Sequence, residues 1–190
     1  MLECLNNFAT GRNLRIAMVV FIVALTAINV AATLFYNATG GYGILDLGGG
    51  ANLFDDRGSY TPDRAYALIA HYGQAGIQGY YGLLLADILF PATLGLFALL
   101  AIATAMRRIA PRQQWPYALA LLPLAYTLAD WCENAGILAM LLNYPQELYQ
   151  VATVTNTLRG IKGALATASL LLAGGSWLFA ILTRRRPATV

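Results

Sequence analysis

The sequence predicts an all-α integral membrane protein, a four-transmembrane-helix antiparallel bundle that forms a single domain over residues 1–190. The first observation is composition: 58% of the residues are hydrophobic and 11% are charged, whereas soluble domains contain about 25% charged residues. The second is that four apolar stretches each reach the length of about 20 residues that a helix needs to cross a bilayer. These spans cover approximately residues 14–36, 81–106, 115–142 and 163–183.

The third observation is the distribution of basic residues, which predicts the orientation. Eight of the 12 Lys and Arg residues lie before the first span, between the second and third, or after the fourth: Arg12, Arg15, Arg107, Arg108, Arg112, Arg184, Arg185 and Arg186. Short loops rich in Arg remain in the cytoplasm. We therefore expect a protein of the bacterial inner (cytoplasmic) membrane with both termini cytoplasmic, N-in/C-in. Because this topology explains the net charge of +3, nucleic acid is not an expected partner.

Residues 37–80 are predicted to form a long extracytoplasmic loop that contains a short amphipathic helix between spans 1 and 2. The glycine triplet 48–50 disfavours regular structure in the first half. Thr61 and Pro62 then form a helix-start signal, an N-cap followed by proline. Apolar side chains recur on one face of that helix at Ala65, Leu68, Ile69 and Tyr72. Five nearby tyrosines are typical of an aromatic belt at the membrane surface: Tyr60, Tyr66, Tyr72, Tyr80 and Tyr81.

Five charged side chains lie inside or at the edge of the apolar segments, at nearly the same depth. At about 1.5 Å per residue, Asp87, Glu133 and Lys162 each lie about 30 to 33 Å from the cytoplasmic arginines. Asp130 is slightly deeper, and Arg159 is about one turn further out. A charge at the bilayer centre costs at least about 2.5 kcal/mol, so such groups normally face a protein interior or a wet cavity. This layer is therefore the candidate site, towards the outer leaflet.

Helical spacing predicts which faces carry the layer. Asp130, Glu133 and Asn134 share one side of the third span, at i, i+3 and i+4. The facing residues of the fourth span are Thr155, Asn156, Arg159 and Lys162. Small residues are expected to let these two helices approach closely: Ala125, Ala129, Gly160, Gly163, Ala164, Ala166 and Ala168. Together these faces predict a polar chamber that opens outward beneath the loop.

A structural interpretation of the same residues competes with a ligand site. Lys162 lies so near the end of its span that we expect its ammonium to extend to the headgroups, and Asp87 to sit favourably near the start of its helix. For Asp130 and Glu133, the alternative to a site is a salt bridge to Arg159 that fixes the helix register.

The residue types that the chain lacks restrict its chemistry. His71 is the single histidine, so a multi-histidine metal site is excluded and Ser-His-Asp catalysis is not expected. Cys4 and Cys132 are predicted too far apart in depth to form a disulfide within one chain. No phosphate loop, dinucleotide fingerprint or haem motif is present, and no cofactor is predicted. Paired carboxylates beside a guanidinium suit proton transfer or headgroup binding, with Tyr126 and Trp131 lining an apolar part.

Four spans that carry intramembrane acids such as Asp130 and Glu133 resemble the sterol-isomerase and sigma-2-receptor group of small membrane proteins. The resemblance implies a lipid-like ligand held near buried carboxylates. Because no diagnostic motif aligns, no residue role is transferred from that group.

The sequence thus predicts a protein that binds a lipid or other amphipathic small molecule in a polar chamber open to the outer leaflet. The ligand-binding candidates are Asp87, Tyr126, Asp130, Trp131, Glu133, Asn134, Asn156, Arg159 and Lys162. One alternative is a structural or accessory subunit that binds a partner membrane protein and whose polar layer is a helix-packing salt-bridge network. A second alternative is an isomerase-like acid-base enzyme that acts on a lipid-like substrate within the membrane.

Overall fold

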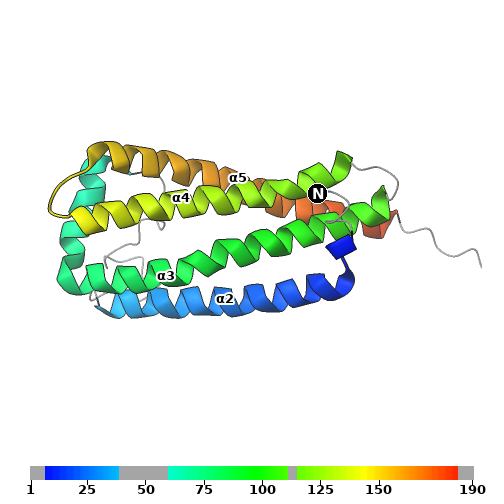
Figure 1. Cartoon of the computed structure of the whole chain (residues 1–190), viewed down its shortest axis with the longest axis horizontal. Coiled ribbons are helices and arrows are strands. Elements are labelled where there is room, and N and C mark those ends of the chain that lie inside the picture. The colour runs from blue at the N-terminus through cyan, green and yellow to red at the C-terminus, as the bar shows by residue number, and fades with distance from the viewer. Residues whose placement is uncertain (1–6, 39–59, 111–114, 184–190) are drawn as a thin grey trace, which may run out of the picture.

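The computed structural model describes residues 7–38, 60–110 and 115–183. Within these ranges the chain contains no strand and forms α2 (Gly11–Ala38), α3 (Pro62–Ile109), the 3-10 helix η1 (Trp115–Leu121), α4 (Leu122–Asn143) and α5 (Tyr149–Leu182). Figure 1 shows the four long helices side by side along the long axis, each running in the opposite direction to the one before it. The prediction of an all-α chain is confirmed for the described residues.

Three of the four predicted spans lie in helices that are long and apolar enough to cross a membrane, namely α2, α3 and α5. α4 is not among them, because the polar residues Asp130, Glu133 and Asn134 lower the mean hydropathy of its middle. α3 begins at Pro62 rather than at residue 81, and α5 begins at Tyr149 rather than at residue 163. Both helices therefore extend well beyond their apolar segments.

The start of α3 crosses one end of the bundle before the helix turns along the long axis. Thr61 is the N-cap, and its hydroxyl oxygen accepts a hydrogen bond from the Arg64 backbone N–H at 3.3 Å; Pro62 follows it, as predicted. Gly73 then interrupts the helix with a φ of +59°, a conformation that a Cβ atom disfavours. Residues 62–72, here called the crossing segment, consequently lie across that end of the bundle (Figure 1).

Aromatic side chains hold the crossing segment at both of its ends. Tyr72 packs edge-on against Phe35 of α2 with ring centroids 5.1 Å apart, and Tyr80 packs on the same ring at 5.2 Å. At the other end, the Leu148 backbone N–H donates a hydrogen bond to the Tyr66 hydroxyl. Four of the five tyrosines of the predicted belt are at most 7% exposed, namely Tyr60, Tyr66, Tyr72 and Tyr80. The predicted surface belt is wrong for these four, because their rings belong to the core.

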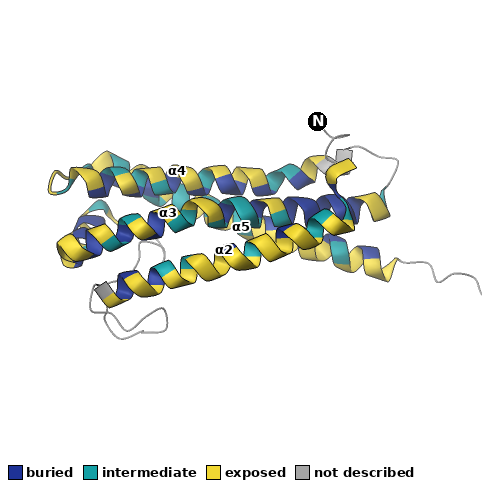
Figure 2. Cartoon of the chain, turned by 60° about the horizontal axis from the view of Figure 1, so that its bottom comes forward, coloured by how far each residue is buried: buried dark blue, intermediate teal, exposed yellow. Residues whose placement is uncertain are grey.

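α3 is the central helix, since it packs against α2, α4 and α5, whereas the main partner of α2 is α3 alone. The buried residues of α2 are three alanines along its length, Ala17, Ala24 and Ala32, which let two helices approach closely, and the aromatic Phe35 and Tyr36 near its end. Figure 2 shows that most of the remaining surface of α2 is exposed. Its exposed side chains include Ile22 and Val23, at 51% and 64%. The arrangement is a group of three helices, α3, α4 and α5, with α2 against one side.

Close contacts within this group occur at glycines other than those predicted. A Cβ atom at Gly136 of α4 would overlap Thr155 of α5, and one at Gly95 of α3 would overlap Thr127 of α4. Gly160 and Gly163 have nothing within 4 Å of such an atom, so the predicted close approach at these two positions is wrong. At the contact between α4 and α5, the glycine therefore lies on α4 and the larger residue on α5, whereas the predicted glycines are both on α5.

Several sequence predictions fall on residues outside the described ranges. They concern Cys4, the glycine triplet 48–50, Arg112 and the arginines at 184–186.

Candidate functional site

Five of the predicted site residues meet where α3, α4 and α5 pack together. They are Asp87, Asp130, Glu133, Asn134 and Lys162, here called the Lys162 network. The Lys162 ammonium lies 3.1 Å from Oδ1 of Asp130 and 2.7 Å from Oε2 of Glu133, so one cation of α5 bridges two carboxylates on one turn of α4. The i, i+3 spacing of the two acids is what places both on the face that Lys162 reaches.

Asn134 extends the network to α3. Its Nδ2 donates to Oδ2 of Asp87 at 3.0 Å and to Oδ2 of Asp130 at 3.1 Å. Asp130 therefore contacts Lys162 through one oxygen and Asn134 through the other. A continuous set of polar contacts runs from Asp87 on α3 through α4 to Lys162 on α5.

The centre of the Lys162 network is buried. The side chains of Glu133, Asp130 and Lys162 are 0%, 5% and 14% exposed. The expectation that Lys162 extends to the headgroups is wrong, because its ammonium points between two buried carboxylates. Asp87 was also expected near the start of its helix, and this expectation is wrong. Asp87 lies far from either end of α3, because this helix begins at Pro62 rather than near residue 81.

Two further candidates from α5 have different positions. The side-chain Oδ1 of Asn156 accepts a hydrogen bond from the Tyr60 backbone N–H at 2.9 Å. This contact fixes the chain just before the crossing segment, so Asn156 has a structural role there. Arg159 is half-buried and lies one turn before Lys162 on the same helix.

The two aromatic candidates of α4 lie on different faces. Tyr126 is 5% exposed and lies one turn before Asp130. Trp131 is 41% exposed, and its indole Nε1–H donates to the Ile88 carbonyl oxygen of α3 at 3.0 Å. Trp131 therefore links α3 to α4 at the molecular surface.

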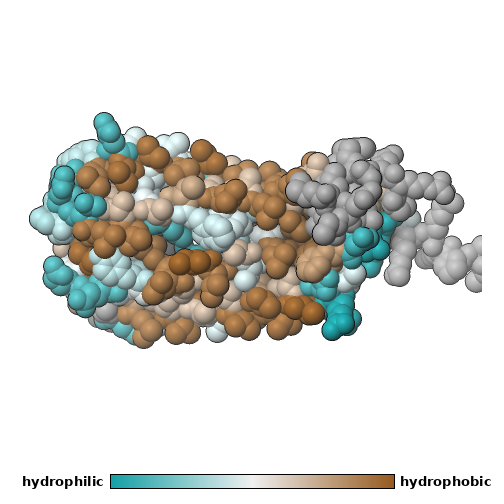
Figure 3. Space-filling view, viewed as in Figure 1, coloured by the Kyte–Doolittle hydropathy of each residue, from teal (hydrophilic) through white to brown (hydrophobic). Residues whose placement is uncertain are grey.

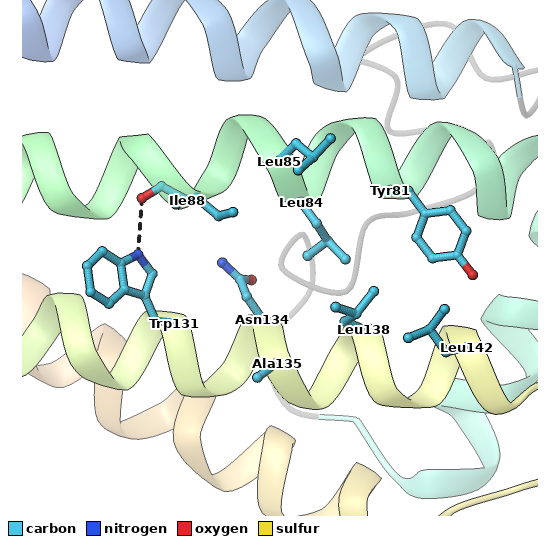
Figure 4. Close-up of a pocket in the computed structure, with 9 residues that line it drawn as sticks. All are labelled: Tyr81, Leu84, Leu85, Ile88, Trp131, Asn134, Ala135, Leu138 and Leu142. Atoms are coloured by element: carbon cyan, nitrogen blue, oxygen red, sulfur yellow. Dashed lines mark hydrogen bonds between the residues drawn. The ribbon is translucent and has the colours of Figure 1, made fainter.

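An open apolar groove runs between α3 and α4 beside the Lys162 network. Its volume is about 570 Å³, and its lining residues are Tyr81, Leu84, Leu85, Ile88, Trp131, Asn134, Ala135, Leu138 and Leu142. Figure 4 shows Trp131 and Tyr81 towards the two ends, leucines from both helices between them, and the Asn134 amide directed into the space between α3 and α4. Eight of the nine lining side chains are apolar or aromatic, and Asn134 joins the groove to the charged residues behind it.

A smaller cavity of about 160 Å³, here called the chamber, lies where α2, α3 and α4 come together. Its lining residues are Ile28, Ala32, Tyr80, Leu83, Leu84, Asp87, Phe90, Asn134 and Ile137. Leu84 and Asn134 line both cavities, so the chamber adjoins the groove. Asp87 faces the chamber, whereas neither Lys162 nor Arg159 is among the described residues that line either cavity.

The groove was not predicted from the sequence, although a signal for its α3 wall exists. Tyr81, Leu84, Leu85 and Ile88 recur at i, i+3, i+4 and i+7, which is the spacing of one helical face. In a helix that is apolar on every side, this spacing does not distinguish a groove wall from a lipid-facing surface.

No protein family, no curated protein and no solved structure matches this chain.

Proposed function

We propose that the four helices form an antiparallel bundle in the bacterial inner membrane, with both termini in the cytoplasm. Figure 3 supports this placement, since hydrophobic residues dominate the middle of the visible face and hydrophilic residues gather towards its ends. Exposed aliphatic side chains such as Val23, Leu128 and Leu171 suit contact with lipid. α4 crosses with the others in this arrangement, because its acidic residues are enclosed by α3 and α5.

We further propose that the protein binds a lipid or other amphipathic small molecule, with the apolar part of the ligand in the groove. The observation that carries this proposal is the position of Asn134: its amide lies in an apolar groove and also hydrogen-bonds two carboxylates. A volume of about 570 Å³ is within the range of about 300 to 1,000 Å³ for small-molecule sites. An apolar site with one polar group in its wall matches an amphipathic ligand.

The polar wall of the groove at Asn134 provides the selectivity in this proposal. Lipid tails are as apolar as the leucines that line the groove, so moving an acyl chain from the bilayer into the groove gains little free energy. A ligand must therefore be recognised through the polar groups near Asn134. Recognition of the polar group distinguishes a specific ligand from the bulk lipid that covers any membrane protein.

A groove-filling substitution tests the proposal. Leu138 is 38% exposed and lines the groove, so Leu138→Trp places an indole in it without enlarging a buried side chain. Leu128 is 59% exposed on the same helix and lies outside the groove, so Leu128→Trp is the matched control. We expect native mass spectrometry after gentle extraction to detect a discrete bound lipid-like mass on the wild type and on Leu128→Trp, and to detect none on Leu138→Trp.

The circular dichroism spectrum and melting temperature should agree among the three proteins. If Leu138→Trp retains the bound mass, or if the wild type carries none, the groove is not a ligand site. The groove would then be a packing defect beside a structural charge network.

A further inference from the structure

We propose that the head group recognised beside the groove is a cation, an amine or quaternary ammonium held in the chamber next to Asp87. This inference rests on the proposed amphiphile-binding function and specifies its ligand class. It also replaces the head-group contacts predicted from the sequence, in which Arg159 and Lys162 would bind the polar end of the ligand.

The positions of the charged groups argue against an anionic head group. Lys162 lies between two carboxylates at 2.7 and 3.1 Å, and its side chain is 14% exposed. Its charge is therefore directed at Asp130 and Glu133, and it does not line the chamber or the groove. An anion entering the chamber would instead meet Asp87, the charged residue among the described lining residues.

Among the described residues, the Lys162 network beside the chamber has a negative formal charge. It contains three carboxylates and one ammonium, and the carboxylates remain in excess when Arg159, one turn before Lys162 on α5, is included. Charges in a site of low dielectric interact strongly, so an excess of carboxylate favours a cationic ligand over an anionic one.

The remaining walls of the chamber also suit an ammonium group. Tyr80 and Phe90 contribute aromatic rings to a cavity that contains a carboxylate, and aromatic faces attract ammonium groups. The chamber volume of about 160 Å³ has room for about five water-sized groups. A trimethylammonium group, with four heavy atoms, matches that size. The chamber and the groove share Leu84 and Asn134 in their linings, and the proposal places the chain attached to this head group along the groove.

The test compares three probes that share a twelve-carbon chain and differ in head-group charge: dodecyltrimethylammonium, dodecanol and dodecanoate. Each is titrated into the full-length protein in nanodiscs of zwitterionic lipid, and bound probe is measured by native mass spectrometry against empty nanodiscs. We expect the cation to bind about tenfold more tightly than dodecanol, because its charge is attracted by the carboxylate and by the aromatic faces. Dodecanoate should bind more weakly than dodecanol.

Asp87→Asn removes the charge while keeping an oxygen that can accept the hydrogen bond from Asn134. We expect it to reduce cation binding to the level of dodecanol and to leave dodecanol binding unchanged. Glu147→Gln makes the same charge change at an exposed position between α4 and α5 and should retain the preference for the cation.

The possible failures are distinguishable, and the probe series on the wild type needs no variant to fold. Equal binding of all three probes, or tightest binding of dodecanoate, overturns the cation assignment. If Leu138→Trp then abolishes binding of these probes, the wild-type groove binds amphiphiles, and the proposed function stands without the cation assignment. Absence of any bound probe on the wild type overturns both the cation assignment and the proposed function.

Discussion

At the scale of single residues, Lys162 stabilises α4 against α5 by placing one ammonium between two acids. Glu133 is fully buried, and its contact with the ammonium, at 2.7 Å, is the shorter of the two. Buried carboxylates require such a partner, because an uncompensated charge in an apolar interior is costly. The bridge is therefore a structural element of the site, whereas Asp87 and Asn134 face its cavities.

Replacing Lys162 by an apolar residue of similar length should destabilise the protein. We expect Lys162→Met to lower the free energy of unfolding by about 3 to 5 kcal/mol, the usual effect of removing one partner of a buried ion pair. Adding Glu133→Gln should restore part of the loss, because it removes one of the two orphaned charges. Thermal unfolding in detergent measures both effects. Arg64→Met, at an exposed position of the crossing segment, is the control and should unfold like the wild type.

The sequence predicted the faces of the polar residues but not the bridge from Lys162 to two acids. The spacing of Asp130, Glu133 and Asn134 placed these three on one side of α4, where the structure has them. Arg159 and Lys162 also share a side of α5 and differ by about 4.5 Å in height. The acids that the Lys162 ammonium reaches depend on the axial position of α5 relative to α4. That position is set by packing between helices, which the sequence of either helix alone does not contain.

At the scale of helices, the contact of Gly136 with Thr155 fixes how closely α4 and α5 approach. Thr155 is 1% exposed, and its side chain occupies the space that a Cβ atom on Gly136 would need. The sequence predicted close packing at the wrong glycines, because Gly160, Gly163 and their neighbours are also small and equally suitable for it. Glycine content identifies helices that can approach closely, but several faces of α5 carry small residues, so it does not identify the face.

A methyl group at Gly136 should therefore separate α4 from α5. We expect Gly136→Ala to destabilise the protein by about 1 to 3 kcal/mol, the range for overpacking a tight contact. Combining it with Thr155→Ala should recover stability, since that change removes the atoms that the methyl group would meet. Gly163→Ala, which meets nothing within 4 Å, should unfold at or above the wild-type temperature. Equal melting temperatures for Gly136→Ala and Gly163→Ala would contradict this account.

The crossing segment shows a second limit of local sequence patterns. Thr61 and Pro62 correctly predicted where the helix starts. The sequence also suggested a helix lying in a loop, separate from the second span. Instead, helix resumes directly after Gly73, and one residue with positive φ changes the direction of the chain. A single glycine in an otherwise helical stretch does not reveal whether it continues the helix or turns it.

At the scale of the whole molecule, the two ends of the bundle differ in construction. The crossing segment closes one end with a tyrosine-rich core. The first and last described residues lie at the opposite end, together with the end of α3 (Figure 1). There Arg107 donates to the Ala9 carbonyl oxygen at 2.8 Å, and the Arg108 guanidinium lies 4.5 Å from the Trp177 ring centroid. The end that carries these arginines is the cytoplasmic end in the proposed topology.

Cysteine labelling of intact cells tests this orientation. In a Cys4→Ser, Cys132→Ser background, we expect Gln74→Cys, exposed at the crossing-segment end, to react with a membrane-impermeant maleimide. Thr183→Cys, at the opposite end, should react only after the inner membrane is permeabilised. Labelling of Thr183→Cys alone in intact cells would show that the bundle is inserted the other way.

The sharing of one ammonium by two carboxylates also constrains how this protein can change during evolution. If Asp130 or Glu133 is replaced first, Lys162 keeps a partner, and the remaining acid keeps its cation. If Lys162 is replaced first, two carboxylates lose the contact with this ammonium in the same step. Neutral drift can therefore begin at either acid, whereas substitution of the lysine becomes tolerable only afterwards. Among descendants of this sequence, we expect loss of Lys162 to occur mainly in lineages that have already lost an acid.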